Sequence, residues 1–111
     1  MLDDTLVLFT SEFGRTPFTQ SGADQIGTGR DHNHVGFSVW MAGGGVKGGI
    51  SYGTTDEVGY KSDLNPVPWH DFHATVLHLL GIDHTKLTHY HNGIQRRLTN
   101  IHGEVLNSII A

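Results

Sequence analysis

The sequence predicts an α/β fold with few strands and two main helices. Residues 5–10 form a run that is apolar or β-branched on both faces, as in strands buried within a parallel sheet. Residues 71–80 carry apolar side chains at helical spacing between a capping aspartate and Gly81. A second apolar stripe over residues 101–111, after Asn100 as a cap, predicts the last helix.

The remaining segments predict short strands and glycine-rich connections. Residues 37–42 favour a second strand, and residues 50–52 a further short one. The polar stretch 11–33 is long for an unstructured connector, which indicates a functional segment. Five of the seven residues 43–49 are glycine, but Lys47 precedes glycine rather than Ser or Thr, so the run predicts a tight turn with close backbone approach rather than a phosphate loop.

The length sets the domain organisation. The 111 residues suffice for one small domain, and only 37% of them are hydrophobic. Two helices and two or three strands cannot cover both faces of a strand at residues 5–10. We therefore expect residues 1–111 to be either a single domain that pairs with another copy or the C-terminal fragment of a larger α/β domain, associated with a missing N-terminal half.

Composition excludes several classes of function. Seven basic residues stand against 11 acidic ones, for a net charge of -4, which disfavours nucleic acid as a partner. The chain has no cysteine, which excludes disulfides and thiolate chemistry. No apolar run reaches the roughly 18–20 residues of a membrane span, so none is predicted.

Two polar groups next to the predicted strands carry the candidate chemistry. Glu12 and Arg15 follow the first strand, and Asp31, His32 and His34 precede the second. Ligands bind at the carboxyl ends of strands in open α/β sheets, and carboxylate with imidazole suits a divalent metal such as zinc. An arginine there can bind an oxyanion. Alternatively, Glu12 and Arg15 simply pair with each other.

Other histidines have weaker patterns. His70 and His73 lie three residues apart at the start of the first predicted helix, a spacing at which two side chains can share a metal. The competing interpretation, which we favour, makes Asp71 a cap and His73 an ordinary helix residue. His89 and His91 fall in a polar connector, where we expect them to be exposed.

Several motifs occur in a fixed order. They are SEFGRTP at residues 11–17, GRDH at 29–32, AGGGVKGG at 42–49, TDE at 55–57, DFHATVLHLLGIDH at 71–84 and RLTN at 97–100. In this order they resemble the DUF1501 family over nearly the whole chain, and the chain is similar to the C-terminal part of such a protein. That family in turn resembles a branch of the alkaline phosphatase and sulfatase superfamily.

The resemblance implies a partial doubly wound sheet with metal ligands at strand ends. Glu12 stands where the superfamily has a metal-binding pair, and Phe13 takes the place of the second ligand. Either His32 or His34 corresponds to a later histidine ligand. Together with Asp31, which the residue pattern alone singles out, Glu12, His32 and His34 are the candidate metal ligands, with zinc as the expected metal. Arg15 is then expected to bind the ester oxyanion.

The resemblance also implies a function. The chain is expected to be the C-terminal portion of a metal-dependent phosphatase- or sulfatase-like hydrolase acting on a small anionic ester. No residue matches the superfamily's nucleophile, so the chain alone is expected to be inactive. The alternative is a non-catalytic binding or assembly module, which Phe13 favours. Family members are usually exported, although residues 1–4 do not resemble a signal peptide.

Overall fold

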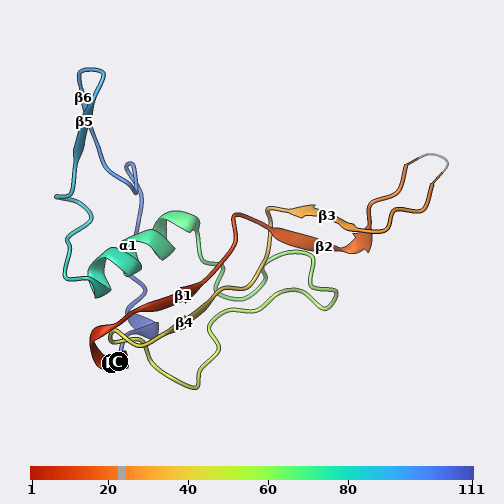
Figure 1. Cartoon of the computed structure of the whole chain (residues 1–111), viewed down its shortest axis with the longest axis horizontal. Helices are drawn as coiled ribbons and strands as arrows, with labels where there is room; N and C mark the ends of the chain where they lie inside the picture. Colours follow the sequence, from red (N-terminus) through yellow and green to blue (C-terminus); the bar gives the residue numbers. More distant parts are fainter. Residues whose placement is uncertain (23–24) are drawn as a thin grey trace. The chain divides into compact units, whose positions relative to one another are not determined.

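The computed structural model describes residues 1–22 and 25–111. Its elements in chain order are η1 (Leu2–Asp4), β1 (Val7–Phe9), β2 (Gly14–Thr19), β3 (Arg30–Asn33), β4 (Trp40–Ala42), α1 (Trp69–Leu79), β5 (His89–His91), β6 (Ile94–Arg96) and η2 (Asn107–Ile109) (Figure 1). The strands form three two-stranded sheets, β1–β4, β2–β3 and β5–β6, of which the last two are antiparallel.

The chain divides into two compact units. The helical unit comprises Met1–Val7, Met41–Ile50 and Val67–Ala111. The hairpin unit comprises Leu8–Trp40 and Ser51–Pro66. The names refer to α1 in the first unit and to the β2–β3 hairpin in the second.

The predicted doubly wound α/β sheet is wrong. Residues 5–10 form only the short strand β1, which pairs with β4 in a two-stranded sheet. Val7 and Leu8 are each 38% exposed and Phe9 is 75% exposed, so the strand is not buried on both faces. Of residues 37–42 only the end becomes β4, and residues 50–52 form no strand.

The second main helix is also wrong. Asn100 and Gly103 adopt positive φ angles of 55° and 103°, which a right-handed helix does not allow. The backbone N–H of Leu106 donates to the Thr75 hydroxyl at 2.9 Å instead of to its own helical turn. Bonds to other segments thus replace a helical ladder over residues 101–111, which keep only the single turn η2.

The helix predicted at residues 71–80 is confirmed as α1, and it begins two residues earlier. Pro68 is its N-cap, so Asp71 lies in the first turn and does not cap the helix. Gly81 has a φ of 76° and donates to the His78 carbonyl at 2.9 Å. Ile82 donates to the Leu77 carbonyl at 2.9 Å, which completes a Schellman motif. The C-terminal glycine therefore ends the helix as predicted.

The core of the helical unit is built around α1, which buries side chains on more than one of its faces. Phe72, Ala74 and Leu77 are buried there, together with Ile109 of η2. Polar contacts hold the C-terminal segment to the same helix, because the Asp71 carboxylate accepts the backbone N–H of Glu104 at 2.9 Å. Apolar packing and side-chain-to-backbone bonds thus fix residues 104–109 against α1.

The glycine run makes the tight turn that was predicted. Gly43 has a φ of 73°, and a Cβ there would collide with the Thr5 carbonyl oxygen. Lys47 donates through Nζ to the Ser108 carbonyl at 3.1 Å. The run therefore packs closely on neighbouring backbone of the helical unit.

In the hairpin unit, β2 and β3 form an antiparallel pair. Both strands lie within residues 11–33, where the sequence predicted no strand. Asn33, only 2% exposed, donates through Nδ2 to the carbonyls of Gly36 at 3.1 Å and Tyr60 at 2.6 Å. Its Oδ1 accepts the Val35 N–H at 3.1 Å. One buried amide therefore joins the end of β3 to the 51–66 segment.

Candidate functional site

Three side chains gather at one end of the β2–β3 hairpin. Arg15 of β2 lies opposite His32 of β3 in the strand register. The rings of His32 and Phe13 are stacked with their centroids 3.7 Å apart, and the Arg15 guanidinium carbon lies 5.5 Å from the Phe13 ring centre. Alternate residues of a strand and directly opposed residues share one face, which explains why these three meet. We call them the Phe13–Arg15–His32 cluster.

The backbone positions the cluster closely. Arg15 donates through one guanidinium nitrogen to the Arg30 carbonyl at 2.9 Å, which fixes its head group across the hairpin. Gly14 is required between Phe13 and Arg15, because a Cβ there would lie 2.5 Å from the Phe37 Cβ. A guanidinium carries five N–H donors, so this contact leaves others for a ligand.

Glu12 adds a negative charge beside the cluster. A backbone hydrogen bond holds the pKa of its carboxyl below the usual value, and the Ser11 hydroxyl, which donates to Oε2 at 2.9 Å, lowers it further. The charges of His32 and Arg15 act in the same direction. Glu12 and Arg15 nevertheless form no ion pair within 4.0 Å in the part of the chain that the structure describes. Glu12 is therefore an exposed, ionised carboxylate whose charge interacts with that of His32.

The predicted metal ligands are only partly brought together. Glu12 and His32 interact electrostatically, whereas Asp31 accepts the backbone N–H of His32 at 2.8 Å through Oδ1. His34 is exposed beyond the end of β3. Among residues 1–22 and 25–111, no group of three or more His, Asp or Glu side chains is arranged to hold a metal. The assignment of Glu12, Asp31, His32 and His34 as ligands stays a prediction.

Two residues important to this site were not recognised as such from the sequence. Phe13 appeared only as a side chain unable to bind metal, yet it is the surface on which His32 and Arg15 lie. Asn33 stood inside the histidine segment without an assigned role. The alternation of Phe13 and Arg15 around Gly14 is typical of a strand and could have revealed the role of Phe13. No local sequence pattern predicts that the Asn33 amide is buried.

The other histidines are distributed differently from the predicted pair. The His73 ring contacts Trp69 edge-on at 5.2 Å, while the His70 ring lies 5.0 Å from that of His102. His89 and His91 are exposed, as predicted, but they belong to strand β5. The β5–β6 hairpin turns at Asn92-Gly93 with φ angles of 49° and 79°, and this dipeptide was its sequence signal.

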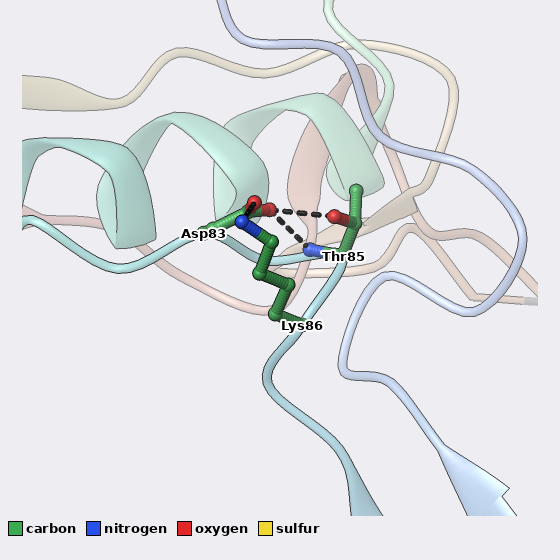
Figure 2. Close-up of polar contacts among 3 residues, drawn as sticks. All are labelled: Asp83, Thr85 and Lys86. Atoms are coloured by element: carbon green, nitrogen blue, oxygen red, sulfur yellow. Dashed lines mark hydrogen bonds and ion pairs between the residues drawn. The ribbon is translucent and has the colours of Figure 1, made fainter.

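A charged turn follows α1. The Asp83 carboxylate accepts hydrogen bonds from the Thr85 hydroxyl at 2.6 Å and the Thr85 N–H at 2.9 Å, and Lys86 lies 3.3 Å away (Figure 2). These contacts, the Thr85 hydroxyl first, lower the pKa of Asp83 to about 2. All three groups belong to one local turn, so the shift has a structural explanation.

The comparisons with known proteins identify the family. The model of the DUF1501 family, described as a protein of unknown function, matches residues 1–110, and the chain belongs to this family. No curated protein and no solved structure gives a significant match. The relation to alkaline phosphatases and sulfatases therefore stays a prediction. Among the helices of the described residues, none has the length and apolar character that a membrane crossing needs.

Proposed function

We propose that this chain contributes the substrate-anion site of a phosphoric- or sulfuric-ester hydrolase, with Arg15 and His32 binding the oxyanion of the ester. The observation that supports this is the convergence of Phe13, Arg15 and His32 at one end of β2–β3. The nucleophile is proposed to come from outside residues 1–111.

The chemistry of the cluster suits a tetrahedral anion. The guanidinium of arginine matches phosphate and sulfate oxygens with two parallel N–H donors. Arg15 is held by the Arg30 carbonyl and the Phe13 ring, so less side-chain freedom is lost when an anion binds. His32 supplies a second N–H donor beside it.

The described residues do not supply a complete set of metal ligands for the proposed hydrolase. A catalytic zinc site has three protein ligands and an open position. The described residues offer Glu12 and His32 within electrostatic reach of each other, and no group of three ligands. These residues do not fit a whole metal centre, and no catalytic step through a metal is assigned to them.

A non-catalytic binding module is the second candidate, and the position of Phe13 favours it. In the resemblance to the phosphatases, Phe13 stands where a metal ligand is expected. In the structure its ring is stacked on His32 at 3.7 Å. The same anion site would then bind a phosphorylated or sulfated molecule without hydrolysing it.

Titration with inorganic phosphate at low salt tests the anion site. We expect the side-chain NMR signals of Arg15 and His32 to shift saturably and the Arg15→Gln variant to bind at least tenfold more weakly. Arg96→Gln is the matched control, because Arg96 lies opposite His89 in β5–β6 just as Arg15 lies opposite His32. Equal losses in both variants, or no shift at Arg15, would contradict the proposal.

Zinc separates the two candidates. If Glu12 is a ligand of a hydrolase's metal, added Zn²⁺ strengthens phosphate binding by the parent chain and has no such effect in Glu12→Gln. If phosphate binding is the same with and without Zn²⁺ in both chains, the non-catalytic module is favoured. Circular dichroism of each variant confirms that the fold is retained.

A further inference from the structure

An open hollow of about 490 Å³ lies beside the first turn of α1, within the helical unit. One wall is formed by the start of the helix, including His70 and Asp71. The other wall is formed by the segment 101–104, including His102 and Glu104. Two imidazoles and two carboxylates thus line one small opening, and none of them takes part in the site proposed above.

The separation of the two imidazoles matches the geometry of a shared metal. The ring centroids of His70 and His102 lie 5.0 Å apart, and the ring planes are inclined by 55°. A metal bound 2.0–2.1 Å from one nitrogen of each ring, at a tetrahedral angle, sets the centroids about 5 Å apart. The spacing of the two rings is therefore compatible with one metal held between them.

Backbone hydrogen bonds hold the segment that carries His102. The N–H of His102 donates to the Thr99 carbonyl at 3.0 Å, and Thr99 is fully buried. On the other side, the N–H of Glu104 donates to the Asp71 carboxylate at 2.9 Å. The wall formed by residues 101–104 is consequently tied to the start of α1 through Asp71.

The charges at the hollow favour a cation over an anion. A helix N-terminus by itself attracts negative charge. Here the carboxylates of Asp71 and Glu104 already lie at that end and supply negative charge to the opening. Neutral imidazoles are ligands for zinc, nickel and copper, whereas calcium and magnesium prefer oxygen.

We propose that His70 and His102 form a bidentate site for a divalent transition metal. Water or a small exogenous ligand completes the coordination, since the described residues contain no group of three ligands. Two protein ligands make an exchangeable site, with copper bound more tightly than zinc by the usual order of affinities. The site is independent of the anion site proposed for the hairpin unit.

His89 and His91 provide an internal comparison. They also form a histidine pair, on the exposed strand β5, but their ring centroids lie 6.4 Å apart and the rings are nearly parallel at 22°. That separation is too wide for both rings to bind one tetrahedral metal. The structure thus predicts that one of these two pairs binds the metal and the other does not.

Residue-resolved NMR of the whole 111-residue chain tests the proposal. On titration with Zn²⁺ we expect saturable shifts of the imidazole signals of His70 and His102 and of the Gly103 amide. Low amounts of Cu²⁺ should broaden the same signals first. His70→Ala and His102→Ala should each weaken binding at this position at least tenfold, whereas the double substitution of His89 and His91 to alanine should not change it.

Two results would overturn the proposal. One is a chain in which zinc or copper perturbs the signals of His89 and His91 while those of His70 and His102 stay unchanged. The other is a set of folded single variants that retain the parent affinity at the hollow. The titration of the unsubstituted chain tests the proposal even if a variant fails to fold. Phosphate titration at Arg15 is read separately, so failure of either proposal leaves the other intact.

Discussion

In the helical unit the buried side chains are mainly apolar, whereas in the hairpin unit they are polar. Phe72, Ala74, Leu77 and Ile109 form the apolar core of the helical unit. The buried side chains described in the hairpin unit are those of Thr16 and Asn33. Burial of apolar surface therefore stabilises one unit, and a hydrogen-bonded amide organises the other. The candidate anion site lies in the unit whose described residues include no buried apolar side chain.

Removing a buried ring should give the largest effect and should do so only in the helical unit. Phe72 is 5% exposed and stacked on Trp69 with ring centroids 4.7 Å apart. Phe72→Ala should lower the free energy of unfolding by about 3 kcal/mol, through lost transfer energy and a cavity. Phe18→Ala is the matched control, because Phe18 of the hairpin unit is 58% exposed and should cost less than about 1 kcal/mol. Urea unfolding followed by circular dichroism measures both, and equal losses would contradict the comparison.

Removing the Asn33 amide should affect the hairpin unit instead. Asn33→Ala leaves the Gly36 and Tyr60 carbonyls without their donor, at a cost of about 2 kcal/mol. Amide hydrogen exchange should accelerate at Val35, whose N–H loses its acceptor, while α1 keeps its protection. Asn107→Ala, which removes an exposed side chain, should leave exchange in the hairpin unit unchanged. Faster exchange confined to α1 would refute the assignment.

The sequence predicted the parts of the fold that depend on local signals. The helix α1 and its Gly81 end follow from spacing and from the need for a positive φ. The apolar stripe at residues 101–111 gave a wrong helix, because the segment bonds to Thr75 and Asp71 rather than to itself. The prediction of a doubly wound sheet was also wrong. It depended on a resemblance and on the apolar run 5–10, whose strand β1 is not buried on both faces.

The candidate site was predicted in composition more than in arrangement. Glu12, Arg15 and His32 were singled out, and the structure places them near one another. The strand pairing that does this joins Arg15 to His32, and neither strand has the buried apolar face that specifies a register. Nor could the His70–His102 approach be predicted, because helical spacing pointed to His73 as the partner of His70.

A substitution at the end of α1 sharpens the comparison at a smaller scale. Gly81 has a φ of 76°, and a Cβ there would meet nothing within 4 Å, so Gly81→Ala tests conformational strain without a clash. We expect a loss of about 1 kcal/mol. Gly48→Ala is the control in the same unit, since its surroundings are equally open and its φ is not in the positive range. Thermal or urea unfolding that showed the same loss for both variants would contradict the role of the left-handed cap.

The smallest effect is expected at the exposed turn after α1, where hydrogen bonds rather than burial perturb an ionisable group. The pKa of Asp83 is lowered to about 2, chiefly by the Thr85 hydroxyl and next by the Thr85 N–H, with Lys86 contributing less. Thr85→Ala should therefore raise this pKa toward the ordinary value of 3.8, and Lys86→Ala should raise it by a smaller amount. A carboxyl NMR titration measures both, and a larger shift in Lys86→Ala would show that charge dominates.

Because the folded pKa of Asp83 lies below its unfolded pKa, the stabilisation is present above about pH 4 and is lost as the pH falls toward 2. The exposed position keeps this contribution small, so acid unfolding of the helical unit should depend little on Asp83.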